Sequence, residues 1–404
     1  MKIKVSISLV VLLFLSVTIF GQTPTKWRGP QANGIYPDKG LLKSWPAEGP
    51  EVAWTFNDLG QGHSSPVFTK DNIYVSGMFE DIGYIFKLTL KGELVWKVTY
   101  GKEFKESWPG SRSSPVVAGD RLYMLSGMGN LVCLNTADGK LVWSKNLLKD
   151  FDGRQITWGL VETVVIDGDK LYCTPGGIKN NVIALDRNTG SLIWSSPGMG
   201  DKSAYCTPLL VDMGKRKILV TLTAANIIGI DAGTGNMLWN YGQIDKFAVL
   251  ANTPLYFDMS LFCFSGIDVG GVKLNLTPDG SAVTTAWISK PMDCRMGGVV
   301  LVNGYIYGSG DRNPEWQCID WKTGEQKYAS KEIPKGNIIS ADGMLYCYSD
   351  KGDLALVKAD PSAFQIVSKI KVTAGSDQHW AHTVINKGIL YVRHGKSLIA
   401  YKIK

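Results

Sequence analysis

The chain of 404 residues lacks the short motifs that most often identify an enzyme or a metal protein. It has seven cysteines, but no two are adjacent and no Cys-x-x-Cys pair occurs. The common zinc and redox signatures are therefore absent, and an odd number of cysteines does not indicate a disulfide scaffold. The four histidines show no Ser-His-Asp order, and no glycine-rich phosphate loop stands out.

Charge and long apolar runs are also scarce in most of the chain. The formal net charge is +7 and no dense Lys/Arg run appears, which disfavours nucleic-acid binding. Hydrophobic residues make up 45% of the chain and charged residues 20%, as expected for a packed globular protein. Beyond the N-terminal region, no segment is apolar enough to span a membrane as a helix.

The N-terminal region is the exception. Two lysines precede an apolar run from Val5 to Phe20, and the small residue Gly21 follows, which is the layout of a secretory signal peptide. A membrane anchor is the alternative, but the run is short for a span and contains serines and a threonine. We predict a signal peptide over residues 1–21 and a periplasmic or secreted mature protein. Because the first cysteine is Cys133, we expect no lipid anchor at the mature N-terminus.

An internal repeat is the strongest feature of the sequence. It is seen in CLNTADGKLVW (133–143), ALDRNTGSLIW (184–194), GIDAGTGNMLW (229–239) and CIDWKTGEQKY (318–328). Each copy predicts a β-hairpin in which an Asp or Asn folds onto the following backbone, a Gly adopts positive φ, and the second strand ends in an aromatic residue. The turn residues Asn135, Asp186, Asp231 and Asp320 are therefore predicted to be structural rather than catalytic.

The closing residues recur every 39 to 51 residues, which is the length of one four-stranded propeller blade. They are Trp54, Trp96, Trp143, Trp194, Trp239, Trp287 and Tyr328, with Val367 in the weakest copy. Residues 382–404 predict three strands, and residues 51–56 can supply the fourth. We predict an all-β, eight-bladed β-propeller of four-stranded antiparallel blades, closed by an N-terminal strand that pairs with the C-terminal blade; seven or nine blades are alternatives.

Two further expectations follow from this arrangement. Each closing indole should pack between neighbouring blades, with its N–H on a carbonyl oxygen. Residues 22–50 should form an N-terminal segment along the rim, with Trp27 and Trp45 among its packing residues, and residues 51–404 should form the propeller domain.

The hairpin pattern, the SSPVV and TPL strand starts and the stretch WRGPQANGIYPDKGLLKSWPAEGPEVAW resemble PQQ-like (pyrroloquinoline quinone repeat) β-propeller proteins over nearly the whole mature chain. The resemblance implies one of two functions. The protein is either a quinoprotein alcohol dehydrogenase or a propeller without cofactor, such as the scaffold of outer-membrane β-barrel assembly. The dehydrogenases carry adjacent cysteines over the quinone and an acidic and amide set that holds Ca²⁺. This sequence has no Cys-Cys pair and no matching Ca²⁺ motif.

The inner strands of a propeller begin near its channel, where loops from all blades converge. Four such starts are HSSP (63–66), RSSP (112–115), YCTP (205–208) and ANTP (251–254). Their Ser/Thr-Pro core is predicted to be scaffold, because proline is tolerated at the first position of a strand. The variable residues at comparable places are His63, Arg112, Trp158, Glu162, Tyr205, Asn252, Arg295, His379, Trp380 and His382.

We predict that these ten residues form a ring at one channel mouth and bind a small polar ligand, a sugar or a peptide segment. The alternative is that they make inter-blade hydrogen bonds and line a water-filled channel. A metal site is not expected, because His379 and His382 are three apart and point to opposite faces of an extended strand.

The leading functional hypothesis is a monomeric, non-catalytic, extracytoplasmic propeller that binds an envelope protein or a small ligand at these loops. It needs no cofactor and binds no nucleic acid. One alternative is a dehydrogenase of alcohols or sugars that uses pyrroloquinoline quinone with Ca²⁺. The other is a polysaccharide-associated binding module.

Overall fold

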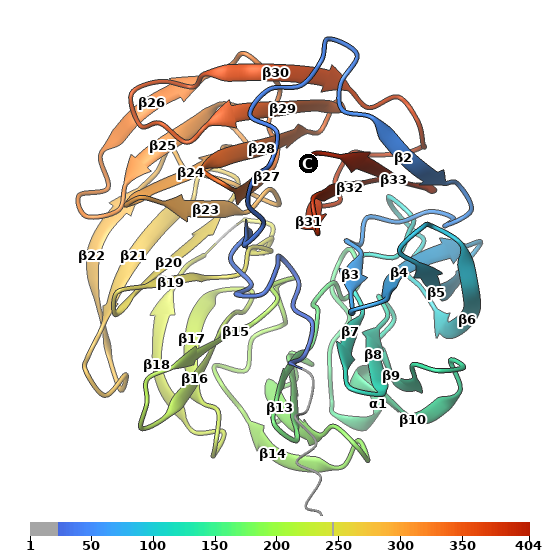
Figure 1. Ribbon diagram of the computed structural model, residues 1–404. Coiled ribbons are helices and arrows are strands. Elements are labelled where there is room, and N and C mark those ends of the chain that lie inside the picture. Colours follow the sequence, from blue (N-terminus) through green and yellow to red (C-terminus); the bar gives the residue numbers. More distant parts are fainter. Residues whose placement is uncertain (1–22, 245) are drawn as a thin grey trace, which may run out of the picture.

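The structure is a computed structural model that describes residues 23–244 and 246–404, within which eight sheets stand around one axis (Figure 1). Each blade contains four antiparallel strands, one blade gains a short fifth strand in parallel, and one short helix, α1 (Leu147–Asp150), follows the second blade. The predicted eight-bladed propeller is confirmed. The predicted signal peptide lies outside the described residues, and none of the described helices is long and apolar enough to cross a membrane.

The first four blades cover residues 67–242. Blade 1 consists of β3 (Val67–Phe68), β4 (Asn72–Phe79), β5 (Ile82–Thr89) and β6 (Leu94–Lys102). Blade 2 consists of β7 (Val116–Ala118), β8 (Arg121–Leu125), β9 (Asn130–Asn135) and β10 (Leu141–Asn146). Blade 3 consists of β11 (Val165–Asp167), β12 (Lys170–Cys173), β13 (Val182–Asp186) and β14 (Leu192–Ser196). Blade 4 consists of β15 (Leu209–Asp212), β16 (Lys217–Leu222), β17 (Asn226–Asp231) and β18 (Met237–Gly242).

The remaining blades complete the circle. Blade 5 consists of β19 (Leu255–Phe257), β20 (Ser260–Ser265), β21 (Gly270–Leu276) and β22 (Val283–Ser289). Blade 6 consists of β23 (Val299–Val302), β24 (Tyr305–Ser309), β25 (Trp316–Asp320) and β26 (Gln326–Ser330). Blade 7 consists of β27 (Gly336–Ala341), β28 (Met344–Ser349), β29 (Asp353–Lys358) and β30 (Ile366–Lys371). Blade 8 consists of β31 (Val384–Asn386), β32 (Ile389–His394), β33 (Ser397–Lys402) and β2 (Val52–Phe56).

Blade 8 closes the ring because it contains both ends of the propeller domain. Strand β2 pairs antiparallel with β33, with Trp54 opposite Ala400 and Phe56 opposite Leu398. This is the predicted closure, and the dark red and blue strands lie side by side in Figure 1. Strand β2 is the outermost strand of this blade, whose other three strands come from the C-terminal end of the chain.

The indoles join the blades as expected. Trp143 Nε1 donates to the Arg187 carbonyl at 2.9 Å, and Trp194 Nε1 donates to the Ala232 carbonyl at 3.2 Å. The other indole bonds of this kind are Trp54 to Leu90, Trp96 to Thr136, Trp239 to Gly280 and Trp287 to Trp321. Each indole therefore contacts the hairpin turn of the following blade.

The hairpin turns also have the predicted chemistry. Asp186 Oδ1 accepts hydrogen bonds from the backbone N–H groups of Asn188 and Thr189, and Gly190 has φ +71°. A Cβ at Gly235, which also has positive φ, would lie 2.7 Å from the ring of Trp194. The turn carboxylates are thus committed to the backbone, and the turn glycines make room for the indole of the preceding blade.

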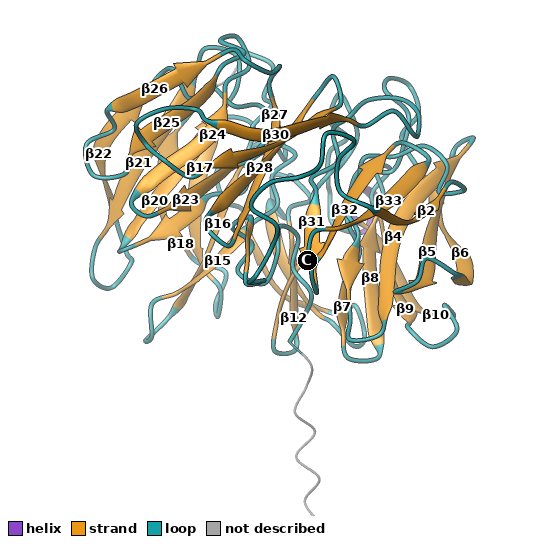
Figure 2. Ribbon diagram, turned by 45° about the horizontal axis from the view of Figure 1, so that its top comes forward, coloured by secondary structure: helices purple, strands orange, loops and turns teal. Residues whose placement is uncertain are grey.

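The N-terminal segment takes two paths. Trp45 lies on the rim of blade 7, where its ring centroid is 6.2 Å from that of Tyr346 and its backbone N–H donates to Ser368. Strand β1 (Ile35–Tyr36) instead pairs in parallel with the inner strand β27, so this part of the segment crosses the centre of the propeller (Figures 1 and 2). Only its later residues follow the predicted rim course.

Candidate functional site

The channel wall is held together by hydroxyls that link consecutive inner strands. The N–H of Ser65 donates to Ser114 Oγ at 3.0 Å, the N–H of Ser114 to Thr163 Oγ1 at 3.2 Å, and the N–H of Thr163 to Thr207 Oγ1 at 3.0 Å. All four residues are buried. Three of the four predicted Ser/Thr-Pro starts therefore take part in this scaffold, whereas the hydroxyl of Thr253 in the fourth start has no hydrogen-bond partner among the described residues.

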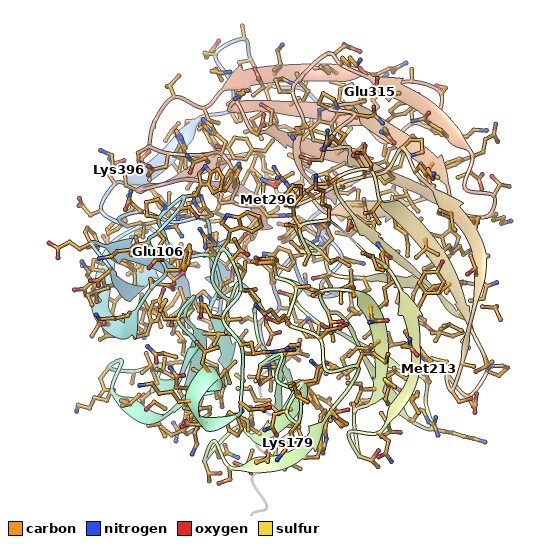
Figure 3. The ribbon with its side chains drawn as sticks, turned by 180° about the vertical axis from the view of Figure 1, so that it is seen from behind. Glu106, Lys179, Met213, Met296, Glu315 and Lys396 are labelled. Atoms are coloured by element: carbon orange, nitrogen blue, oxygen red, sulfur yellow. The ribbon has the colours of Figure 1, made fainter. Side chains whose placement is uncertain are left out.

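A cavity lies at this mouth, on the face opposite the crossing N-terminal segment. Figure 3 views the molecule from this side, with Met296 close to the axis. We call this cavity the cup. Its lining residues are Trp27, His63, Trp108, Arg112, Trp158, Val161, Thr163, Tyr205, Thr207, Val249, Ala251, Arg295, Met296, Trp380 and His382. Five of them are aromatic side chains of Trp or Tyr, two are arginines, and no described Asp or Glu lines the cup.

Seven of the ten predicted mouth residues meet at the cup. They are His63, Arg112, Trp158, Tyr205, Arg295, Trp380 and His382. Binding by these residues stays a prediction, and the structure shows only that their side chains converge. The other three, Glu162, Asn252 and His379, lie outside the cup lining.

Arg112 is a clamp for the cup's aromatic loops. Its guanidinium donates to the carbonyls of Ser107, Trp108 and Trp158. These bonds hold two indole-bearing loops from neighbouring blades at the mouth. Arg112 therefore positions the walls of the cup, and most of its hydrogen-bonding capacity is used by the protein itself.

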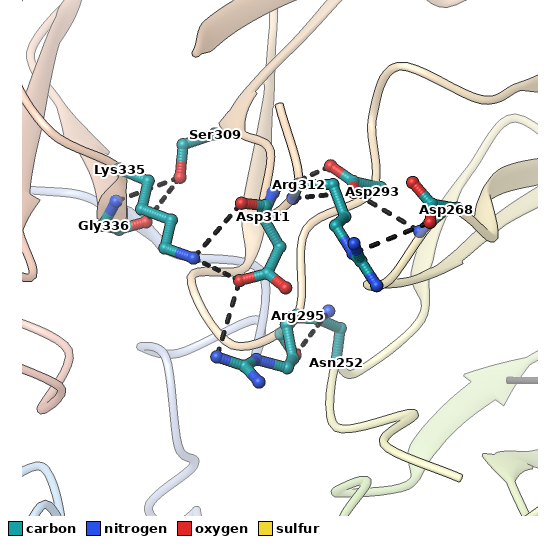
Figure 4. A network of polar contacts seen from close by, with 9 residues as sticks. All are labelled: Asn252, Asp268, Asp293, Arg295, Ser309, Asp311, Arg312, Lys335 and Gly336. Carbon is teal, nitrogen blue, oxygen red and sulfur yellow. Dashed lines mark hydrogen bonds and ion pairs between the residues drawn. The ribbon is translucent and has the colours of Figure 1, made fainter. Parts of the chain in front are cut away.

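Arg295 stands between the cup and a second cavity that Asp311 and Lys335 line. Its Nη2 lies 3.5 Å from Asp311 Oδ1, and Lys335 pairs with the same carboxylate. Figure 4 shows Asp311 between the two cations. The Nε of Arg295 is buried and has no hydrogen-bond partner among the described residues. This guanidinium thus retains an unpaired N–H group.

His63 is the most isolated polar group at the mouth. Both ring nitrogens are buried without a hydrogen-bond partner among the described residues, and the ring lies beside Trp380 with centroids 5.0 Å apart. Burial and, to a smaller extent, the charges of Arg393 and Arg112 lower the pKa of His63 to about 3. The imidazole is therefore neutral, and its unpaired nitrogens carry a cost of about 1–3 kcal/mol each.

The floor of the cup is built by the N-terminal segment. The ring of Trp27 meets that of His382 edge to face, with centroids 5.0 Å apart. Arg28 is buried, and it donates to Val299 O at 2.6 Å and contacts Nδ1 of His382 at 3.1 Å. Since Arg28 can only donate, His382 accepts at Nδ1 and donates from Nε2 to the Met296 carbonyl.

Glu162 and Asn252 have structural partners. Glu162 accepts from the N–H of Thr174 at 2.8 Å, and burial raises its pKa to about 8. Asn252 donates to the carbonyls of Cys294 and Arg295 and accepts from Gly298 N–H, which joins blades 5 and 6. Both side chains are at most 5% exposed, so they support the wall behind the mouth.

His379 belongs to a neighbouring cluster. Its ring stacks on that of His394 with centroids 3.6 Å apart, and its Nδ1 contacts the Tyr348 hydroxyl. His379 and His382 thus have different surroundings. The described residues contain no group of three His, Cys, Asp or Glu side chains placed to hold a metal ion.

The sequence prediction missed two of the cup's aromatic walls. Trp108 is 48% exposed and lies 6.0 Å from Trp380, centroid to centroid. It comes four residues before Arg112, in the same connecting loop, and an exposed tryptophan so close to a blade start is a usable signal. Trp27 was expected on the rim, and no local pattern indicates that it crosses to the axis.

The residues at the cup do not fit a calcium-bound quinone. Such a group needs oxygen ligands for Ca²⁺, and no described carboxylate lines the cup. The seven cysteines are all buried with free thiols, so no disulfide faces the cavity. We therefore assign no step of chemistry to that cofactor here.

The fold is an eight-bladed propeller, and the family model places it in the PQQ-like class. The family model for "Outer membrane protein assembly factor BamB" matches residues 83–330, more than half of the chain. The chain belongs to this family.

Individual relatives are more distant. Quinoprotein ethanol dehydrogenase of Pseudomonas aeruginosa is 26% identical over 167 residues, and the match spans 41% of this chain but only 23% of the dehydrogenase. BamB from Moraxella catarrhalis superposes with a TM-score of 0.61 at 14% identity, covering 84% of this chain and 94% of that chain. A europium-containing methanol dehydrogenase superposes with a TM-score of 0.65 at 12% identity, covering 90% and 88%. At such identities the two superpositions show the fold alone.

Proposed function

We propose that this protein is a non-catalytic, extracytoplasmic propeller that binds a partner protein or a small ligand in the cup. The observation that carries the proposal is the convergence of five aromatic residues and two arginines, from several blade connections and the N-terminal segment, on one open mouth. A concave, mostly apolar surface with a few placed polar groups is the usual form of a binding site. The family description, an outer membrane assembly factor, supports a place in the cell envelope.

A pull-down from envelope extract tests this proposal. Wild-type protein is compared with the double variant Trp108→Ala/Trp380→Ala, which removes two cup walls, and with the control Phe257→Ala, which removes an exposed aromatic residue away from the cup. We expect the double variant to lose a partner that the control retains. Equal recovery of every partner by all three proteins would leave the cup without a role in partner binding.

The similarity to quinoprotein dehydrogenases makes a quinone-dependent enzyme the second candidate. Purified protein is mixed with pyrroloquinoline quinone and Ca²⁺, and dye reduction is followed across alcohols and sugars. We expect no turnover, since the cup offers no carboxylate for Ca²⁺ among its described residues. Substrate-dependent dye reduction would replace the binding proposal with the dehydrogenase.

A further inference from the structure

The electrostatics of the cup select for an anion. Arg112 and Arg295 both line it, and no described carboxylate does. The carboxylate behind Arg112 is Glu103, which is buried and whose pKa burial raises to about 7. Glu103 is therefore partly neutral at pH 7 and balances Arg112 incompletely. Cations set in an apolar cavity attract a negative group more strongly than cations in water do.

The unpaired donors of the cup are enough to bind one anionic group of a ligand. Arg112 already donates to three carbonyls, whereas Arg295 keeps its Nε without a partner. His63 adds a ring N–H that also has no partner among the described residues. Two unpaired donors suit one carboxylate, which accepts at both oxygens.

The walls select for a flat apolar body. The indoles of Trp27, Trp108, Trp158 and Trp380 and the ring of Tyr205 surround the space, and Val161, Val249 and Ala251 fill the gaps. Aromatic faces stack well on planar apolar groups.

We propose that the cup binds a hydrophobic monocarboxylate, with its flat apolar part against the indoles and its carboxylate on Arg295 and His63. This inference rests on the proposed function and specifies its ligand. His63 lines the cup beside Trp380, with their ring centroids 5.0 Å apart. Free aromatic acids and the C-terminus of a peptide that ends in an aromatic residue share this chemistry.

The test measures quenching of tryptophan fluorescence by 2-naphthoate and by its neutral analogue 2-naphthylmethanol. We expect naphthoate to bind about tenfold or more tightly than the alcohol, because a hydrogen bond to a charged group contributes about 1.5–3 kcal/mol. Arg295→Gln should remove this difference and leave the affinity for the alcohol unchanged. Asp311 keeps its partner Lys335 in that variant, so the fold should persist, and a melting curve checks it.

Two further variants complete the comparison. Trp158→Leu should weaken naphthoate and naphthylmethanol equally, because it removes a wall and no charge. Arg121→Gln is the matched control, since Arg121 pairs with Asp120 in the β7–β8 turn and does not line the cup. It should preserve the preference for the acid.

A peptide pair separates the two sources of the ligand. Short peptides that end in phenylalanine are compared as the free acid and as the C-terminal amide. Tighter binding of the free-acid peptide than of naphthoate points to a chain terminus, and the reverse order points to a free acid.

The outcomes distinguish this inference from the proposed function. Saturable binding of naphthylmethanol with equal or weaker binding of naphthoate would overturn the charge selectivity and leave the cup as a binding site. Binding of neither probe would overturn the ligand class, while the pull-down would still decide whether the cup recognises a partner.

Discussion

At the rim of the propeller one residue type makes one contact in blade after blade, whereas at the mouth the side chain varies from blade to blade among His, Arg, Trp and Tyr. Trp143 and Trp194 both donate to a carbonyl in the next blade's turn. His63, Tyr205 and Arg295 occupy comparable places in their blades and share no contact of that kind. At the rim each blade packs against a similar neighbouring blade, so the same tryptophan contact can be repeated. The mouth residues do not have to make the same inter-blade contact. Different side chains around the mouth can therefore recognise an asymmetric ligand.

Removal of a rim indole should reduce the stability of the protein more than any other substitution considered below. Trp194→Ala deletes a buried side chain and its bond to Ala232, so we expect a loss of about 3–5 kcal/mol in the free energy of unfolding. Denaturant and thermal melts measure it. Trp108→Ala, at the exposed mouth, is the control and should melt like the wild type. An unchanged melting curve for Trp194→Ala would refute the role given to the rim indoles.

The carboxyl of Glu162 tests the wall behind the mouth through pH. Burial raises its pKa to about 8, so the folded protein holds a proton that the unfolded chain releases at lower pH. Its contribution to stability is present below the pH at which the unfolded carboxyl ionises, and it is lost as the pH rises towards about 8. Glu162→Gln should flatten this part of the stability profile by a few kcal/mol. A profile with the wild-type slope would show that Glu162 ionises normally.

Arg112 tests whether the mouth is held in place by its own clamp. Arg112→Met should cost about 1–2 kcal/mol, because the carbonyls it holds turn to water or stay unpaired. The freed loops should also make the mouth indoles more accessible to acrylamide quenching. Arg121→Met is the matched control for a lost arginine. Wild-type quenching in Arg112→Met would mean that the loops hold their position without the clamp.

The smallest effect is expected at the hydroxyls that link consecutive inner strands. Thr163→Val keeps the shape of the side chain but leaves the Ser114 N–H without its acceptor, at a cost of about 1 kcal/mol. Thr373→Val, at an exposed position, should cost nothing measurable. Denaturant melts of the two variants measure the difference in stability. Equal midpoints would show that the hydrogen bond to Thr163 does not stabilise the channel wall.

The propeller fold could be predicted from the sequence because its turn and tryptophan motifs are local and repeated. The Asp-to-Gly turn and the closing Trp lie within eleven residues of each other, so one copy specifies a hairpin and eight copies specify the ring. Pairing of β2 with β33 followed from counting the strands left over at the two ends. Tyr328 and Val367, the weak copies, were still placed at the correct blade ends.

The mouth was readable only in part. The rule that inner strands start at the channel brought seven residues to the cup, since the offset from each start is a local property. This rule could not predict that Arg112 donates to carbonyls in two loops. It also could not predict that the side chains of Asn252 and Glu162 point into the channel wall. Those choices depend on neighbours from other blades.

Sequence alone determined the blade and the family and favoured eight blades over seven or nine, because a repeated turn and a repeated indole act within one unit or between adjacent ones. Only the tertiary structure decided that Trp27 and Arg28 cross to the axis and form the floor of the cup. Their contacts with His382 and Val299 join residues more than 270 positions apart. Such contacts exist only after the ring has closed and brought its first and last blades together.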